Sequence, residues 1–93
     1  MNASFVGQEP LSLDPSYCVY ILRCSDNTFY SGCTANLEDR LSRHQRGSVT
    51  ATKNRRPVEV VTYTVFNDKY KAFAFEKYLK TGSGSAFMNK RLI

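Results

Sequence analysis

The sequence predicts a small α/β (α+β) domain in which a three-stranded antiparallel sheet is flanked by three helices, in the order β-β-α-β-α-α. Two apolar stretches separated by turn residues, at residues 17–24 and 29–33, indicate a β-hairpin. A third stretch, residues 58–66, is rich in Val and Thr and lies between segments with helix caps. The 93 residues are enough for one domain with a modest core.

The first strand, residues 17–24, is apolar on both faces apart from Arg23, which is typical of a central strand. Residues 25–28, with the sequence SDNT, supply the turn. Residues 29–33 form the returning strand, where Gly32 permits a close backbone approach.

The first helix is capped by Thr34 or Asn36 and runs to about Arg46. Gly47 ends it, because glycine readily adopts the left-handed conformation that follows a helix. Residues 47–57 then form a basic loop.

The second helix follows the third strand. Asn67 or Asp68 caps it, and it runs to about Lys80, where Gly82 stops it. A short last helix begins at Ser83 or Ser85. These elements complete the predicted order.

The chain divides into residues 1–16, a flexible N-terminal arm containing Pro10 and Pro15, and one domain at residues 17–93. The net charge is +5, and the arm holds two acids and no Lys or Arg, so the domain carries +7. This charge indicates a polyanionic partner, with nucleic acid first, and a solvated basic surface is the alternative.

Three cysteines, Cys18, Cys24 and Cys33, favour a reduced, cytoplasmic compartment, because their odd number and spacing do not suit a disulfide framework. We find no signal peptide and no apolar run long enough for a membrane helix. A zinc site built from the cysteines and His44 matches no finger spacing, so buried inert thiols are the favoured interpretation.

Two polar side chains interrupt the apolar stripe of the first helix. Leu37 and Leu41 define the stripe, and Arg40 and His44 fall within the same arc, four residues apart. A guanidinium on a buried face needs an anion or a polar cleft. The alternative is an Arg that extends past the leucines and a His at the rim.

In the second helix Glu76 lies at the edge of the apolar stripe, beside Phe73 and Leu79. A carboxylate in these surroundings requires a cation. The candidates are Arg40, a bound metal ion, or Lys80 one turn along the same helix.

The hairpin carries two phenols, Tyr20 and Tyr30, which we expect to be near cross-strand neighbours. Tyrosines of this kind are also common as ordinary core residues.

Taken together, these residues resemble the GIY-YIG nuclease domain, in particular its small single-domain, excision-nuclease-like members. The two short motifs are CVY at residues 18–20 and YSG at residues 30–32. LEDRLSRH at residues 37–44 and FEKYLK at residues 75–80 complete the ordered set, which is much more specific than the short motifs alone. The resemblance covers Tyr17 to about Leu92.

The resemblance implies a three-stranded sheet flanked by helices and cleavage of phosphodiester bonds with one divalent metal ion, Mg²⁺ or Mn²⁺. Tyr20 and Tyr30 would be the paired catalytic tyrosines, and Arg40 the catalytic arginine. His44 fills a position that holds His or Tyr in the family. Glu76 would be the metal ligand.

Several positions depart from the family pattern. The position after Gly32, a lysine in some members, is Cys33 here, and Lys53 is the candidate to supply that charge. A late asparagine near the metal ligand occurs in several members, and Asn89 is the candidate for that role.

The expected chemistry assigns one task to each group. Arg40 would bind the scissile phosphate, and Glu76 would hold the metal together with oxygens from DNA. We expect Tyr20 to act as the base, His44 as its proton relay and Tyr30 as a positioning hydroxyl, with exchange of the two tyrosine roles as the alternative. The expected contacts to DNA backbone phosphates are Arg43, Arg46, Lys53, Arg55 and Arg56.

The sequence therefore predicts a metal-dependent DNA endonuclease, with DNA repair or recombination as its setting. The alternative is a non-catalytic nucleic-acid-binding module on the same fold, which would need only the basic surface. A third hypothesis, a housekeeping RNA-binding domain, is supported by the net charge alone.

Overall fold

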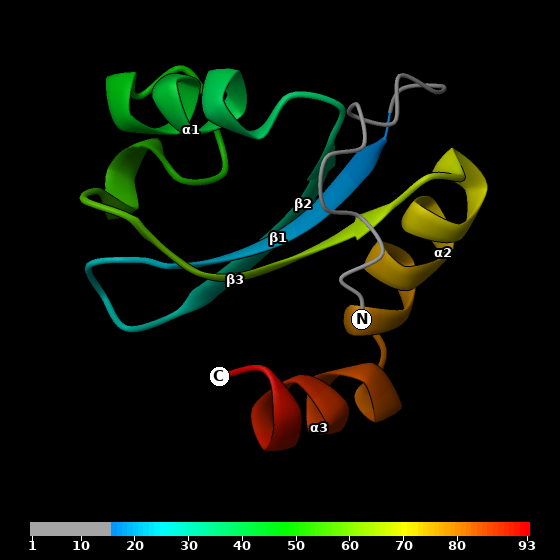
Figure 1. Ribbon diagram of the computed structural model, residues 1–93. Helices are drawn as coiled ribbons and strands as arrows, with labels where there is room; N and C mark the ends of the chain where they lie inside the picture. The colour runs from blue at the N-terminus through cyan, green and yellow to red at the C-terminus, as the bar shows by residue number, and fades with distance from the viewer. Residues whose placement is uncertain (1–15) are drawn as a thin grey trace, which may run out of the picture.

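The computed structural model describes residues 16–93, which form three strands, three α-helices and one short 3₁₀ helix (Figure 1). The strands are β1 (Tyr17–Arg23), β2 (Phe29–Thr34) and β3 (Glu59–Phe66). The helices are α1 (Leu37–Arg46), η1 (Lys53–Arg55), α2 (Lys69–Leu79) and α3 (Gly82–Arg91). The predicted fold class is confirmed, while the predicted arm lies outside the described residues except for Ser16.

The sheet has the order β2-β1-β3, with both pairs antiparallel. β1 is the central strand and is buried on both faces, as its continuous apolar sequence predicted. The hairpin between β1 and β2 turns at Asn27, whose φ of 66° is a left-handed conformation that asparagine tolerates.

α1 begins and ends as the local sequence predicted. The Asn36 side chain caps it by accepting a hydrogen bond from the Asp39 amide, and Gly47 ends it with a φ of 82°. α2 is capped by Asp68, one of the two residues predicted for this role.

The second helix ends at the predicted place, about Lys80, but the predicted start of the last helix was wrong. α2 ends at Leu79, with Lys80 as its C-cap, and Gly82 is the first residue of α3 rather than the residue that stops α2. Thr81 caps α3 by accepting a hydrogen bond from the Gly84 amide, so this helix begins earlier than the serines suggested.

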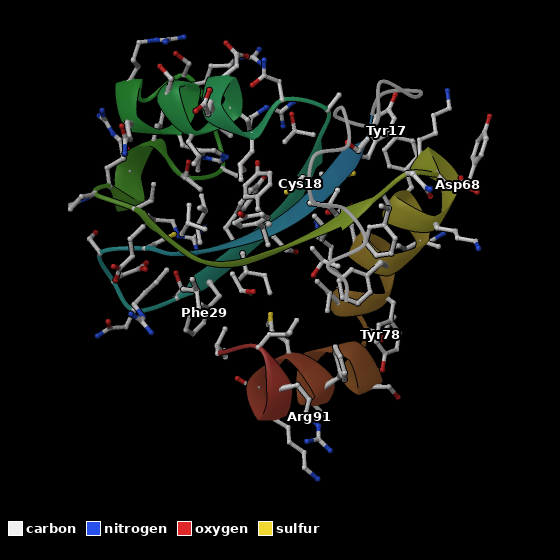
Figure 2. The ribbon with its side chains drawn as sticks, viewed as in Figure 1. Tyr17, Cys18, Phe29, Asp68, Tyr78 and Arg91 are labelled. Atoms are coloured by element: carbon white, nitrogen blue, oxygen red, sulfur yellow. The ribbon has the colours of Figure 1, made fainter. Side chains whose placement is uncertain are left out.

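The helices cover opposite faces of the sheet (Figure 1). α1 lies over a core of side chains from β1, together with Cys24 and Val58 just outside the strands, whereas α2 and α3 cover the other face of β1. Among the residues labelled in Figure 2, Cys18 belongs to the core under α1, and Tyr17 and Phe29 pack against the core under α2 and α3. Within residues 16–93, no helix is both long enough and apolar enough to span a membrane.

Candidate active site

The phenol of Tyr20 occupies the space above Gly32. The two residues are directly opposite each other in the β1–β2 pair, so their side-chain positions share the face toward α1. A Cβ atom at Gly32 would lie 2.5 Å from the Tyr20 hydroxyl oxygen, and Tyr20 itself is 0% exposed. The glycine of the second motif is therefore required because the tyrosine of the first motif fills its side-chain space.

A hydrogen-bonded chain links Tyr20 to α1 and to the loop that follows it. The Tyr20 hydroxyl lies 2.8 Å from Nε2 of His44, and Nδ1 of His44 lies 2.7 Å from Oγ1 of Thr52. His44 and Thr52 are both 0% exposed. The alternative of a histidine at the helix rim is therefore wrong, because this imidazole is enclosed and both of its nitrogens contact hydroxyl groups.

Burial and the nearby Arg40 guanidinium both lower the pKa of His44 from its ordinary value. At neutral pH the imidazole is therefore uncharged, with one nitrogen that donates and one that accepts. An uncharged imidazole can take up a proton, which suits the relay role expected for this residue.

Tyr30 completes an aromatic cluster with Tyr20 and His44. Its ring centroid lies 6.3 Å from that of Tyr20 and 5.2 Å from that of His44. The strand register pairs Tyr30 with Leu22, so the two tyrosines are diagonal neighbours on one face, as expected. Unlike Tyr20, Tyr30 is only half-buried.

Arg40 is half-buried and acts on the phenol and on the imidazole of this cluster. Burial raises the pKa of Tyr20 to about 12, and the Arg40 guanidinium opposes that rise as a hydrogen-bond donor and as a cation. The half-buried guanidinium is therefore close enough to the phenol to affect its pKa, which agrees with its predicted place on the core-facing side of α1.

Glu76 reaches the same region from α2. Its charge contributes to raising the pKa of Tyr20 and of Cys33, while Arg40 lowers the pKa of Cys33. The partly exposed Cys33 thiol therefore lies in the field of both groups, and burial is the main cause of its raised pKa. Cys33 occupies the position that some family members fill with lysine.

Lys80 is the cation in contact with Glu76. Its Nζ lies 2.5 Å from Oε2 of Glu76, one helical turn away, and the Glu76 side chain is 22% exposed. Of the two protein cations considered from sequence, Arg40 and Lys80, the structure places the neighbour on the same helix against the carboxylate. Any metal ion bound by Glu76 must compete with this ion pair.

The donor set at Glu76 fits magnesium only in part. Within residues 16–93, no three His, Cys, Asp or Glu side chains gather into a metal site. A hard cation such as Mg²⁺ is often held by one or two carboxylates with water and substrate phosphate. The residues present therefore fit a metal that binds together with substrate, and His44 is engaged by hydroxyls rather than offered to zinc.

The predicted phosphate contacts divide into two groups. Arg43, Arg46 and Lys53 are exposed, and Arg46 donates a hydrogen bond to Ser42 on its own helix. Lys53 lines a surface groove of about 480 Å³ whose other lining residues are Gln45, Asn54, Arg56, Pro57 and Val58. Among the residues that the structure describes, no ion pair engages the Lys53 ammonium.

Arg55 and Arg56 are tied to the protein itself. Arg55 Nε donates to Oγ1 of Thr28 at 3.1 Å and lies 3.6 Å from Oδ2 of Asp26, so it fastens the loop to the hairpin turn. Arg56 donates to the carbonyls of Lys53 and Gln45, each at 3.0 Å. The prediction that the loop cations serve as phosphate contacts missed these structural roles.

Asn89 is exposed on α3, where its Nδ2 donates to the Ser85 carbonyl at 3.0 Å. α3 belongs to the layer on the opposite face of the sheet from the tyrosines and His44. The printed contacts therefore join Tyr20, Tyr30 and His44. Arg40 and Glu76 act on the phenol through their charges, and Asn89 contacts only its own helix.

Thr52 is the residue of this cluster that the sequence did not reveal. A threonine in a polar loop is ordinary turn composition, and no spacing relates it to His44 eight residues earlier. Its burial and its contact with Nδ1 exist only in the folded chain.

Comparisons with known proteins identify the family of the chain. A family model described as the GIY-YIG catalytic domain matches residues 16–91, so the chain belongs to the GIY-YIG family and carries a nuclease-type domain. Within that family its relatives are UPF0213 proteins. The UPF0213 protein of Pediococcus pentosaceus is 40% identical over 68 residues, or 72% of each chain.

Two further relatives support the same grouping. UPF0213 protein SH2523 of Staphylococcus haemolyticus is 42% identical over 66 residues, covering 70% of this chain and 80% of the relative. The solution NMR structure of UPF0213 protein BH0048 from Bacillus halodurans has a TM-score of 0.53 and 27% identity, covering 81% of this chain and 83% of that chain. The resemblance stated from the sequence is thereby confirmed.

Proposed function

We propose that this protein is a metal-dependent endonuclease that hydrolyses phosphodiester bonds in DNA in the cytoplasm, with DNA repair or recombination as its setting. The observation that carries the proposal is the buried hydrogen bond between Tyr20 and His44 beside the Arg40 guanidinium. A phenol hydrogen-bonded to a neutral imidazole, with a guanidinium nearby, would supply a base, a proton acceptor and a phosphate ligand. The net positive charge of the domain supports a polyanionic substrate.

In the proposed reaction Arg40 binds the scissile phosphate and meets the charge that grows on it. A divalent ion, Mg²⁺ or Mn²⁺, bound by Glu76 and the phosphate would neutralise charge and stabilise the leaving oxygen. Tyr30, half-buried beside Tyr20, would orient the attacking water with its hydroxyl.

Tyr20 is the proposed base. Since its pKa is about 12, the phenol keeps its proton at neutral pH and can take a proton from water only as its own proton leaves. Nε2 of His44, 2.8 Å away, is the acceptor for that proton. The water oxygen bonds to phosphorus while the bond to the leaving sugar oxygen breaks, and that oxygen takes a proton from solvent.

This assignment makes one structural demand. Because Tyr20 is 0% exposed, water must gain access to the phenol when DNA binds. Transfer of Arg40 from the phenol to the phosphate would provide that access. If it does not, Tyr30 takes the base role, since it is the more exposed of the two phenols.

A second candidate function is a nucleic-acid-binding module without catalysis. The contact of Glu76 with Lys80 favours it, because in that state the carboxylate already has its cation. Such a module would require Arg43, Arg46 and Lys53 on the surface but not Glu76.

One panel of assays separates the two functions. Plasmid, flap, junction and single-stranded DNA are incubated with wild type, Glu76→Ala and Glu38→Ala, with Mg²⁺, Mn²⁺ or chelator. We expect wild type and the Glu38→Ala control, which changes an exposed acid of α1, to cleave only with metal. Glu76→Ala should bind DNA without cleaving it. Cleavage by this variant would exclude the metal role of Glu76. Binding without cleavage by wild type would favour the binding module.

A further inference from the structure

Thr52 lies at the end of the buried chain that begins at Tyr20. Its Oγ1 is 2.7 Å from Nδ1 of His44, and its side chain has no exposed surface. The backbone holds it in place, since its amide donates to the Val49 carbonyl at 3.1 Å and its carbonyl accepts from the Arg55 amide at 2.8 Å. The hydroxyl is thus a fixed partner for one particular nitrogen of the imidazole.

The partners at the two ring nitrogens, Tyr20 at Nε2 and Thr52 at Nδ1, together decide which nitrogen of His44 carries the proton. The Arg40 guanidinium opposes the rise in the pKa of Tyr20, but a guanidinium has only donors and offers no acceptor for the phenol proton. The phenol proton therefore has Nε2 as its acceptor, 2.8 Å away. In a neutral imidazole whose Nε2 accepts, Nδ1 must carry the proton, and Thr52 Oγ1 is the acceptor for it.

We propose that Thr52 is a positioning residue that holds His44 in the Nδ1–H tautomer, leaving Nε2 free to take the proton of Tyr20. The kinetic consequence of this inference rests on the proposed function, whereas the assignment of the tautomer does not. In the Nε2–H tautomer the imidazole would have no site for the phenol proton, and the relay would be blocked. Thr52 thus acts through His44 and has no contact with DNA in the mechanism.

The proton transfers in this step determine the protonation state of His44 beside Thr52. One proton passes from water to the Tyr20 oxygen, and the proton of Tyr20 passes to Nε2. His44 then carries a proton on each nitrogen, and Nδ1–H continues to donate to Oγ1 of Thr52. The proton on Nε2 returns through Tyr20 to solvent after the products leave.

The test begins with ¹⁵N NMR of the imidazole, because the chain contains a single histidine and the spectrum has one pair of ring nitrogens. Spectra at neutral pH are compared for wild type, Thr52→Val and Thr52→Ser. Thr52→Val keeps the shape of the side chain and removes the hydroxyl, while Thr52→Ser keeps the hydroxyl. Thr50→Val is the matched control, since Thr50 is exposed in the same loop.

We expect the Nδ1–H tautomer in wild type, Thr52→Ser and Thr50→Val, and a shift toward the Nε2–H tautomer in Thr52→Val. An Nε2–H tautomer in wild type would overturn the proposal, as would an unchanged Nδ1–H spectrum in folded Thr52→Val. If Thr52→Val fails to fold, the wild-type and Thr52→Ser spectra still decide it, because both must show Nδ1–H.

Kinetics provide the second measurement. Thr52→Val should lower kcat about 10- to 100-fold with little change in KM, and Thr52→Ser should restore most of the loss. Equal losses in both variants would assign Thr52 a purely structural role and overturn the inference. If wild type cleaves no DNA, the proposed function fails, while the NMR spectra separately decide the tautomer.

Discussion

The two faces of the sheet are built from different chemistry. On the face toward α1, the core includes Tyr20, and the polar side chains of His44 and Thr52 are buried beside it. On the face toward α2 and α3, the buried side chains are apolar, with Val19 and Ile21 from β1 among them. Successive residues of β1 thus serve different layers, because side chains alternate along a strand.

The difference separates stability from chemistry. Apolar burial stabilises the fold in proportion to the area removed from water. A buried phenol, imidazole and hydroxyl lose their hydrogen bonds to water, and the hydrogen bonds that they make with one another only offset that loss. The α2–α3 layer is therefore the stabilising layer and the α1 layer is the proposed reactive one, with Glu76 reaching the reactive region from the stabilising side.

The largest expected effect is in the apolar layer. Ile21→Ala should lower the free energy of unfolding by about 2–5 kcal/mol, because Ile21 is 1% exposed and truncation leaves a cavity. Urea denaturation measures the loss. Cleavage per folded molecule should remain within about threefold of wild type, and Ile21→Val is the milder variant if the first does not fold.

A large loss of activity in folded Ile21 variants would break the comparison between the two layers. It would mean that the apolar face of β1 also sets the geometry of Tyr20, its neighbour in the chain.

The next effect is in the reactive layer. Arg40→Ala should reduce cleavage about 10²–10³-fold, as expected for the loss of a donor to a developing charge. The free energy of unfolding should change little, because Arg40 is half-buried and forms no ion pair with an acid among residues 16–93. Single-turnover cleavage measures the effect, with Arg91→Ala, at an exposed arginine of α3, as the control. A loss below about threefold would remove Arg40 from the reaction.

The smallest effects concern the cations of the basic loop. Lys53→Ala should weaken DNA binding equally for all sequences and reduce the salt slope by about one. Fluorescence anisotropy at several salt concentrations measures this effect, and a sequence-selective effect of Lys53→Ala would contradict a pure phosphate contact.

Arg55→Ala should lower the free energy of unfolding by up to about 1 kcal/mol, because it loses the link to Asp26 and Thr28. Thermal unfolding measures this loss.

Local sequence was sufficient for most of the fold. Asn36 and Gly47 act within one turn of α1, so its two ends could be predicted from neighbouring residues alone. The continuous apolar run of β1 predicted its central place in the sheet. The start of α3 was misplaced because Thr81, Ser83 and Ser85 are all suitable caps, and local preference does not choose among them.

The candidate site was predictable in part. Helical periodicity put Arg40 and His44 on one face, and strand alternation put Tyr20 and Tyr30 on another, so their approach could be expected. The sequence could not reveal Thr52 as the partner of His44, nor Lys80 rather than Arg40 as the contact of Glu76, because several partners were equally within reach.

By itself, the sequence determined the class of fold, the ends of α1, the basic character of the domain and the ordered set of residues that identifies the family. These properties depend on near neighbours in the chain and on composition. The tertiary structure alone decided that Tyr20, His44 and Thr52 form a closed hydrogen-bonded chain, and that Arg55 and Arg56 hold the loop in place. Such contacts join residues from separate elements. They form only when the layers pack together, because polar groups that are then removed from water need hydrogen-bond partners within the protein.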